Sequence, residues 1–113
     1  MKEGDYTIWG KVQHVKERAP GIFEVSTSSH GGFKLDRARN ARVAAAWRRE
    51  GGWYEEDIDW AIVLFTFPEL FESEDQRASV ISTLKNWLPD SYTEVTGQAV
   101  ALEESFYLRE RVI

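Results

Sequence analysis

The 113-residue sequence has no cysteine and only three prolines. Without cysteine the protein can form no disulfide, no thiolate nucleophile and no cysteine-based zinc or iron–sulfur site. No apolar run approaches the roughly 18 residues that a membrane-spanning helix needs. The first residues, MKEGD, also lack the apolar segment of a secretory signal. We therefore expect a cytoplasmic protein that makes no membrane contact.

Positive charge is also scarce. Fourteen Lys and Arg residues face nineteen Asp and Glu residues, which gives a net charge of -5. Because proteins that bind phosphate backbones are normally basic, general affinity for nucleic acid is not expected. With 42% hydrophobic and 29% charged residues, the composition is that of one globular domain over residues 1–113.

Two segments near the start of the chain are rich in β-branched and aromatic residues. Residues 6–15 and 21–26 are predicted to be strands, and the charged residues 16–20 between them are predicted to be the loop of a hairpin. Residues 33–35 follow a turn rich in serine and glycine and could add a third strand.

Three helices are predicted from capping residues and helical periodicity, over residues 36–51, 73–88 and 89–97. Asp36 is a good N-cap for the first, and the glycine pair Gly51-Gly52 suits its C-terminal end. Ser73 and Gln76 have the spacing of a capping box for the second.

The run from Ile58 to Phe67 is apolar almost all round, so periodicity cannot separate a buried helix from a buried strand. The acids just upstream suit the first turn of a helix, which we favour. Residues 99–113 are expected to form an extended or mixed tail. Together these elements predict an α+β fold, in which a small antiparallel sheet of two to three strands is covered by three to four helices.

Charge is distributed unevenly along the chain. Residues 34–49 hold six basic groups and one acid, a balance of +5, whereas residues 50–76 hold nine acids and no Lys or Arg, a balance of -9. One interpretation is that the two segments are solvated surfaces that partly pair with each other. The other is an acidic patch that docks on a basic partner. The candidate partner-binding residues are Trp53, Tyr54, Glu55, Glu56, Asp57, Asp59, Glu69 and Glu72.

Five tryptophans are many for so short a chain. Trp47, Trp60 and Trp87 lie in apolar patterns and are expected in the core. Trp53 and Tyr54 lie between a glycine pair and three acids, so we expect them to be exposed and available to a partner.

His30, between two serines and two glycines, is the best candidate for a catalytic residue because histidine titrates near neutrality. In this enzyme alternative, hydrolase-like or transferase-like, Glu55, Glu56 or Asp57 would orient His30, with Ser28 or Ser29 as nucleophile. The competing interpretation is a turn in which the glycines supply unusual backbone angles. Neither of the two histidines has a partner at a recognised ligand spacing, so no metal or cofactor is expected.

A second alternative is nucleic-acid binding through the arginine-rich helix, despite the acidic total. In that case Arg39, Arg42 and Arg49 would contact phosphates, and affinity would fall steeply with salt.

The region from Ser26 to about Phe106 resembles an uncharacterised domain family of proteobacterial plasmid, prophage and other mobile-element proteins. The matching segments are Ser26–Leu35, Gly51–Asp57 with Trp60, Phe67–Phe71 and Leu84–Trp87. The family has no established activity, so the resemblance implies where the protein acts rather than how: as a small accessory protein of a phage or plasmid, inside a bacterial host cell. Small phage and plasmid proteins often inhibit bacterial defence, as anti-CRISPR proteins do. The resemblance therefore favours a protein that binds and inhibits a host defence complex, such as a CRISPR effector or nuclease.

Overall fold

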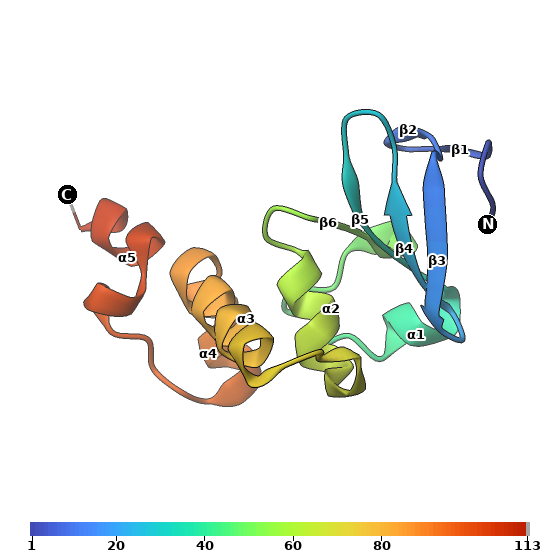
Figure 1. Cartoon of the computed structure of the whole chain (residues 1–113). Coiled ribbons are helices and arrows are strands. Elements are labelled where there is room, and N and C mark those ends of the chain that lie inside the picture. Colours follow the sequence, from blue (N-terminus) through green and yellow to red (C-terminus); the bar gives the residue numbers. More distant parts are fainter. Residues whose placement is uncertain (113) are drawn as a thin grey trace.

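Four antiparallel strands form the main sheet, in the spatial order β3-β4-β5-β6 (Figure 1). They are β3 (His14–Ala19), β4 (Ile22–Ser26), β5 (Gly31–Leu35) and β6 (Trp53–Glu55). The computed structural model describes residues 1–112. The predicted hairpin and the third strand are confirmed, and β6 is a strand that the sequence pattern did not indicate.

The chain before β4 is divided differently from the prediction. Instead of one strand over residues 6–15, a two-stranded ribbon of β1 (Tyr6–Thr7) and β2 (Gly10–Lys11) precedes β3. The Thr7 hydroxyl donates to the Gly10 carbonyl (2.8 Å), which closes the turn of the ribbon. Residues 16–19, expected in a loop, belong to β3, because an edge strand leaves charged side chains in solvent.

The two faces of the main sheet pack against different groups of residues. The strand register places four buried side chains on the face that packs against the helices: Ile22, Phe33, Leu35 and Tyr54. Val25 lies on the other face, where Trp9 and Val12 cover it. The rings of Trp9 and Trp53 meet edge to face with centroids 5.0 Å apart. The N-terminal segment is thus anchored to the sheet by aromatic packing.

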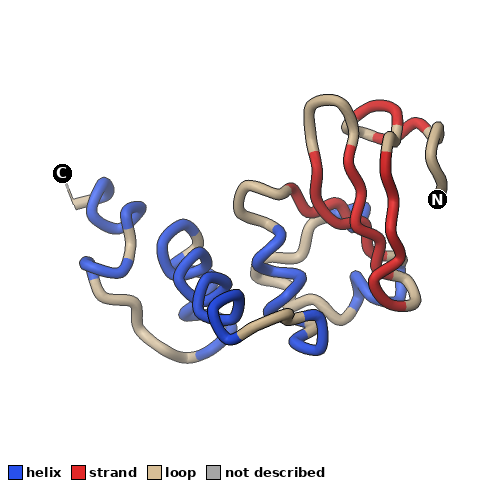
Figure 2. The backbone as a smooth tube through the Cα atoms, viewed as in Figure 1, coloured by secondary structure: helices blue, strands red, loops and turns tan. Residues whose placement is uncertain are grey.

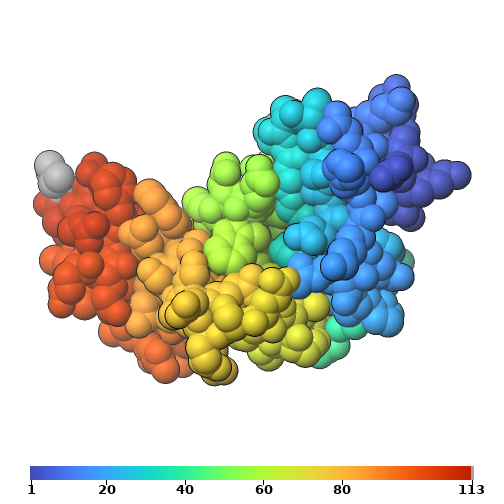
Figure 3. All heavy atoms as spheres, in the orientation of Figure 1, coloured from blue at the N-terminus to red at the C-terminus, as the bar shows by residue number. Residues whose placement is uncertain are grey.

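The first helix lies against the base of the sheet, and the later helices lead away from one side of it (Figure 2). The helices are α1 (Arg37–Ala41), α2 (Trp60–Thr66), α3 (Glu74–Trp87), α4 (Pro89–Thr96) and α5 (Phe106–Arg111), with 3-10 turns at Glu50–Gly52, Pro68–Leu70 and Leu102–Glu104. The molecule is 44 Å long, with the N-terminal ribbon and α5 at opposite ends of it (Figure 3). The α+β class is confirmed, with more strands and helices than predicted. Within residues 1–112, every helix is too short or too polar to cross a bilayer.

Helix α2 confirms a helix within residues 58–67, over Trp60–Thr66, although the acids upstream lie outside its first turn. Its residues 61–64 are all buried, because the sheet packs on one side of α2 and α3 packs on the other. A helix enclosed on two sides needs apolar residues around most of its circumference, which explains why the sequence showed no helical periodicity here.

Helices α3 and α4 begin as predicted. The Ser73 hydroxyl accepts a hydrogen bond from Gln76 N (3.0 Å), and the Gln76 side chain accepts one from Glu72 N (2.8 Å). Pro89 occupies the first turn of α4, and Gly97 ends it in a left-handed conformation (φ 75°).

The expectation that Trp87 lies in the core is wrong. Its side chain is 39% exposed and packs against Phe106 of α5, with ring centroids 5.3 Å apart, because the end of α3 projects beyond the core. The tail that begins at residue 99, expected to be extended or mixed, is mixed: residues 99–101 are irregular, and the 3-10 turn Leu102–Glu104 and α5 follow. Ser105 caps α5 by accepting a hydrogen bond from Leu108 N (3.1 Å). Ile113 lies outside the described residues.

The helix predicted for residues 36–51 ends after Ala41. Asp36 caps its first turn, as predicted. After α1, the guanidinium of Arg48 donates to the carbonyls of Ala41 (3.2 Å) and Val43 (2.8 Å). These side-chain bonds satisfy carbonyls that a longer helix would have bonded internally, so the chain can turn without leaving them unpaired.

The bent path after α1 buries Trp47, as predicted for that tryptophan, and its ring meets Phe65 of α2 with centroids 5.3 Å apart. The path then turns at Gly51 and Gly52, both with φ of 77°. A side chain at Gly52 would collide with the carbonyl of Leu35. The glycine pair therefore does not end a long helix; it lets the chain turn close to β5 and enter β6.

The hydroxyl of Tyr54 connects α1, the turn after it and β6. It donates to Oδ1 of Asn40 (2.5 Å) and accepts from the backbone N–H of Arg49 (3.1 Å). The Asn40 amide in turn donates to the Arg49 carbonyl (2.9 Å). Burial raises the pKa of Tyr54, because an ionised phenolate would be poorly solvated there. The neutral hydroxyl can act as donor and acceptor together, which the network requires.

Replacing Tyr54 with phenylalanine is expected to lower the free energy of unfolding by about 1–2 kcal/mol, because it leaves Asn40 and the Arg49 amide without their partner. The folded pKa lies above the unfolded value of about 10, so the hydroxyl's contribution is complete below that pH and is lost as pH rises through the folded pKa. Urea unfolding at neutral pH and along an alkaline series measures both effects.

The matched control is Tyr6→Phe, since Tyr6 is 83% exposed. Its stability should follow that of the original protein at every pH, whereas Tyr54→Phe should show a shallower alkaline decline. Equal stability of Tyr54→Phe and the original protein at neutral pH would contradict the network's role.

Candidate functional site

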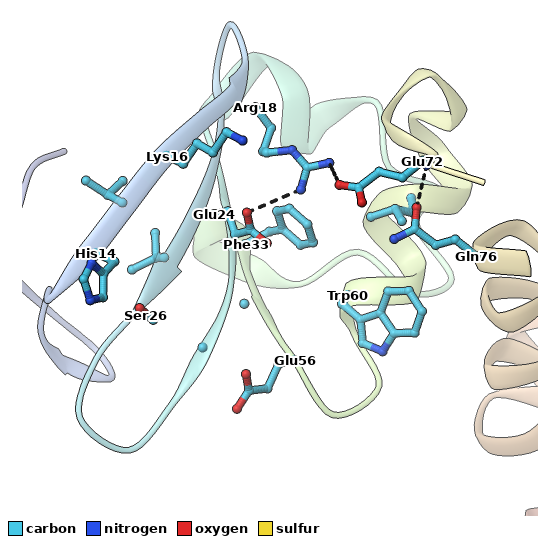
Figure 4. A pocket seen from close by; sticks show the side chains of 15 residues that line it. His14, Lys16, Arg18, Glu24, Ser26, Phe33, Glu56, Trp60, Glu72 and Gln76 are labelled. Atoms are coloured by element: carbon cyan, nitrogen blue, oxygen red, sulfur yellow. Dashed lines mark hydrogen bonds and ion pairs between the residues drawn. The ribbon is translucent and has the colours of Figure 1, made fainter.

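An open cleft of ≈ 700 Å³ lies between the main sheet and the helices (Figure 4). The sheet wall carries His14, Lys16, Arg18, Glu24, Ser26 and Phe33. The opposite wall carries Trp60 and Leu64 of α2, with Glu72 and Gln76 near the start of α3. The cleft forms because the helices cover the sheet near Ile22 and Leu35 but leave it uncovered towards Ser26.

The sheet wall follows from strand pairing. His14 lies opposite Ser26, and Lys16 lies opposite Glu24, so all four side chains point to the same face. Sequence reasoning did not identify this wall as a site. The period-two pattern of His14, Lys16 and Arg18 could have indicated a shared face, but that required placing residues 16–19 in a strand.

Arg18 connects the two walls at one end of the cleft. Its guanidinium lies 3.4 Å from the Glu24 carboxylate and 3.0 Å from the Glu72 carboxylate, and it donates to the Leu70 carbonyl (3.4 Å). The Arg18 side chain is only 15% exposed. Charge-assisted bonds to both walls make Arg18 a structural cross-link rather than a free cation.

Three of the nine acids in residues 50–76 are paired with arginines of the same chain. Asp59 binds the Arg49 guanidinium through both carboxylate oxygens (2.9 and 3.1 Å), which raises the pKa of Arg49. Glu69 lies 3.9 Å from Arg39, and Glu72 pairs with Arg18. Three of the candidate partner-binding carboxylates therefore hold the fold together.

The remaining candidate acids are Glu55, Glu56 and Asp57, called here the acidic loop. All three are exposed, and within residues 1–112 none of them forms an ion pair. Glu55 is the last residue of β6, and Glu56 and Asp57 follow it on the way to α2; of the three, Glu56 lines the cleft. These carboxylates are available to an outside partner.

The expectation that Tyr54 is exposed is wrong, because its side chain is fully buried in β6 opposite Phe33. Trp53 is half-buried between Trp9 and the ammonium of Lys34, which lies 5.2 Å from the Trp53 ring centroid. Their polar neighbours in sequence predict that both side chains are exposed. The turn at the glycine pair instead brings this segment alongside β5, where it pairs as β6.

His30 lies at the exposed tip of the β4–β5 hairpin. Its carbonyl accepts from Thr27 N (2.8 Å), and its own N–H donates to the Thr27 hydroxyl (3.2 Å), so its backbone closes the turn. The imidazole does not line the cleft, whereas Glu56 does. The structure does not assemble the proposed catalytic group of His30, Ser28 or Ser29 and a carboxylate.

The arginines expected to contact nucleic acid have partners within the fold. Arg39 donates to the Pro20 carbonyl (2.8 Å), and both Arg39 and Arg42 lie 5.0 Å from the ring centroid of Phe67. Arg49 is held by Asp59. Arg39 and Arg49 are thus engaged within the fold, while Arg42 stays exposed.

Across residues 1–112, no three side chains of His, Asp or Glu are grouped so that they could hold a metal ion. Compared with protein families, residues 2–113 match the model of a Domain of unknown function, DUF7007. No curated protein and no solved structure matches the chain.

Measurements of unfolding free energy can test whether Asp59 stabilises the fold through its ion pair and Glu56 does not. Asp59→Asn is expected to lower the free energy of unfolding by about 1 kcal/mol, because a neutral amide loses the charge-assisted pair with the partly exposed Arg49. Glu56→Gln should change it by less than about 0.5 kcal/mol. Urea denaturation at low salt compares the two isosteric variants, and equal losses would contradict this difference between the two acids.

Proposed function

This chain belongs to the DUF7007 family, whose function is unknown, and we propose that it acts by binding another protein through the cleft and the acidic loop. The observation that carries this proposal is the acidic loop itself. Three consecutive exposed carboxylates, of which Glu56 lines an open cleft, form no ion pair within residues 1–112. Acids that stabilise a fold are normally paired, as Asp59 and Glu72 are here.

A partner of complementary charge fits this surface. Uncompensated carboxylates speed association with a basic surface and select against acidic ones, more than they raise affinity. The cleft beside them adds aromatic surface from the partly exposed Trp60, which supplies desolvated contacts of the kind that an interface needs.

The partner class that we propose is a nuclease complex of host defence, such as a CRISPR effector, in the cytoplasm of a bacterial host. The resemblance to plasmid and prophage proteins supports this setting. Such complexes bind nucleic acid through basic surfaces, and an acidic loop could occupy one of those surfaces in its place. The protein would then be an anti-CRISPR-like inhibitor that binds without catalysis.

Affinity capture from a lysate of bacteria carrying a CRISPR system tests the proposal. The tagged protein should retain one effector or nuclease in stoichiometric amount, and retention should weaken at higher salt because the attraction is screened. The double variant Glu55→Gln with Asp57→Asn should lose at least about tenfold of the captured partner, because two of the loop's charges are removed. Quantitative mass spectrometry measures the captured amount.

The matched control is Glu94→Gln with Glu110→Gln, which removes the same charge from exposed positions away from the cleft. It should capture as much partner as the original protein. In cells, the original protein and this control should restore transformation by a CRISPR-targeted plasmid, while the loop variant should not. Equal capture by all three proteins would contradict the proposal.

A further inference from the structure

The last residues that the structure describes rest on the protein with little apolar burial. Residues 101–112, called here the arm, contain the 3-10 turn Leu102–Glu104 and α5. Ser105 is the only one of them that is buried. Four large apolar side chains of the arm are 44% to 68% exposed: Leu102, Phe106, Tyr107 and Val112. Because burial of apolar surface normally fixes a short helix to its neighbours, polar contacts must contribute much of what holds the arm in place.

Asn86, near the end of α3, joins that helix to the start of α5. Its side-chain oxygen accepts a hydrogen bond from the N–H of Phe106 (2.6 Å), and its backbone carbonyl accepts one from the Ser105 hydroxyl (2.9 Å). The same hydroxyl accepts from Leu108 N and so caps α5. The first turn of α5 and its attachment to α3 therefore depend on each other.

Two ion pairs complete the attachment, and both are open to solvent. The Lys85 ammonium of α3 lies 2.9 Å from the Glu104 carboxylate, and the Arg111 guanidinium lies 2.7 Å from the Asp90 carboxylate of α4. The four side chains are 23% to 68% exposed. Exposed pairs of this kind are screened by salt and add little net stability, so they hold the arm only weakly.

The chain between α4 and the arm marks where a movable part would begin. Gly97 ends α4 in a left-handed conformation, and the next carbonyl, that of Gln98, accepts a hydrogen bond from the Thr93 hydroxyl (2.8 Å). Val100 packs against the main hydrophobic core, whereas Ala101 is exposed. Release of residues 101–112 would therefore leave the core, α3 and α4 in place.

We propose that the arm is detachable: it opens by local unfolding while the rest of the fold stays intact, and its opening uncovers the indole of Trp87. In the closed state Phe106 packs against that indole, with ring centroids 5.3 Å apart. Segments with few buried apolar contacts are the first to open, and a helix as short as α5 is not stable by itself. Asn86 is the latch of this device.

Opening brings apolar surface into solvent at one end of the molecule. Trp87 is 39% exposed in the closed state and loses its aromatic cover when Phe106 leaves. The inference is independent of the proposed function, because the cleft is lined by residues 14–76 and includes no residue of the arm among residues 101–112.

Hydrogen exchange of single amides, followed by NMR on the full-length isotope-labelled protein, tests the arm. The Arg109 amide, bonded to the Ser105 carbonyl (3.1 Å), reports on α5, and the amide of the buried Leu84 reports on α3. After correction for intrinsic rates, Arg109 should exchange at least about 100-fold faster than Leu84, because opening of the arm requires only part of the fold to unfold.

Asn86→Ala removes the acceptor for the Phe106 N–H without weakening α3, since alanine is the better helix former. It should speed exchange at Arg109 by about fivefold and change that of Leu84 by less than about twofold. The indole N–H signal of Trp87, assigned with Trp87→Phe, should move towards that of an indole in water.

The matched control is Asn86→Asp, which keeps an oxygen acceptor at the same place and should leave the Arg109 exchange rate and the Trp87 signal close to those of the original protein. Exchange at Arg109 as slow as at Leu84 in the original protein would overturn the detachable arm. So would equal acceleration of both amides in Asn86→Ala, since Asn86 would then support the whole fold.

Discussion

The hydroxyl of Tyr54 is donor and acceptor at once, and this double role determines how the middle of the chain is folded. It binds Asn40 and the Arg49 backbone, so α1, the turn at the glycine pair and β6 are held as one unit. With β6 paired to β5, the next residues leave the sheet at its open edge beside the cleft. The position of the acidic loop therefore depends on a buried tyrosine that precedes it directly in sequence.

The acidic excess of the chain serves two purposes that sequence position alone does not separate. Asp59, Glu69 and Glu72 pair with arginines, and so hold distant segments together. The acidic loop has no such partners within residues 1–112 and keeps its charge for solvent or for another molecule. Arg39 and Arg49, two of the arginines expected to contact nucleic acid, are the partners of Glu69 and Asp59 in these pairs.

The cleft arises where two kinds of surface meet. Its sheet wall is polar because alternate residues of the edge strand β3 face it, and its helical wall carries Trp60 and Leu64 at the margin of the core. A tryptophan expected in the core thus lies half in the core and half in the cleft. Catalysis by His30 gains nothing from this arrangement, because the imidazole lies at the hairpin tip, outside the cleft.

The sequence alone determined the local features whose causes lie within a few residues. These are the α+β class, the caps at Asp36 and Ser73 and the ends of α4. The apolar run before Pro68 is ambiguous in sequence, and its packing between the sheet and α3 decides that it is a helix. Tertiary structure decided the early end of α1, the strand at Trp53–Glu55, the burial of Tyr54, the exposure of Trp87 and the pairing of the acids. Each of those depends on groups that are distant in sequence or on side-chain bonds to the backbone, such as Arg48 on Ala41 and Val43. Local propensity cannot register such contacts, because the free energy they contribute appears only once the chain has packed.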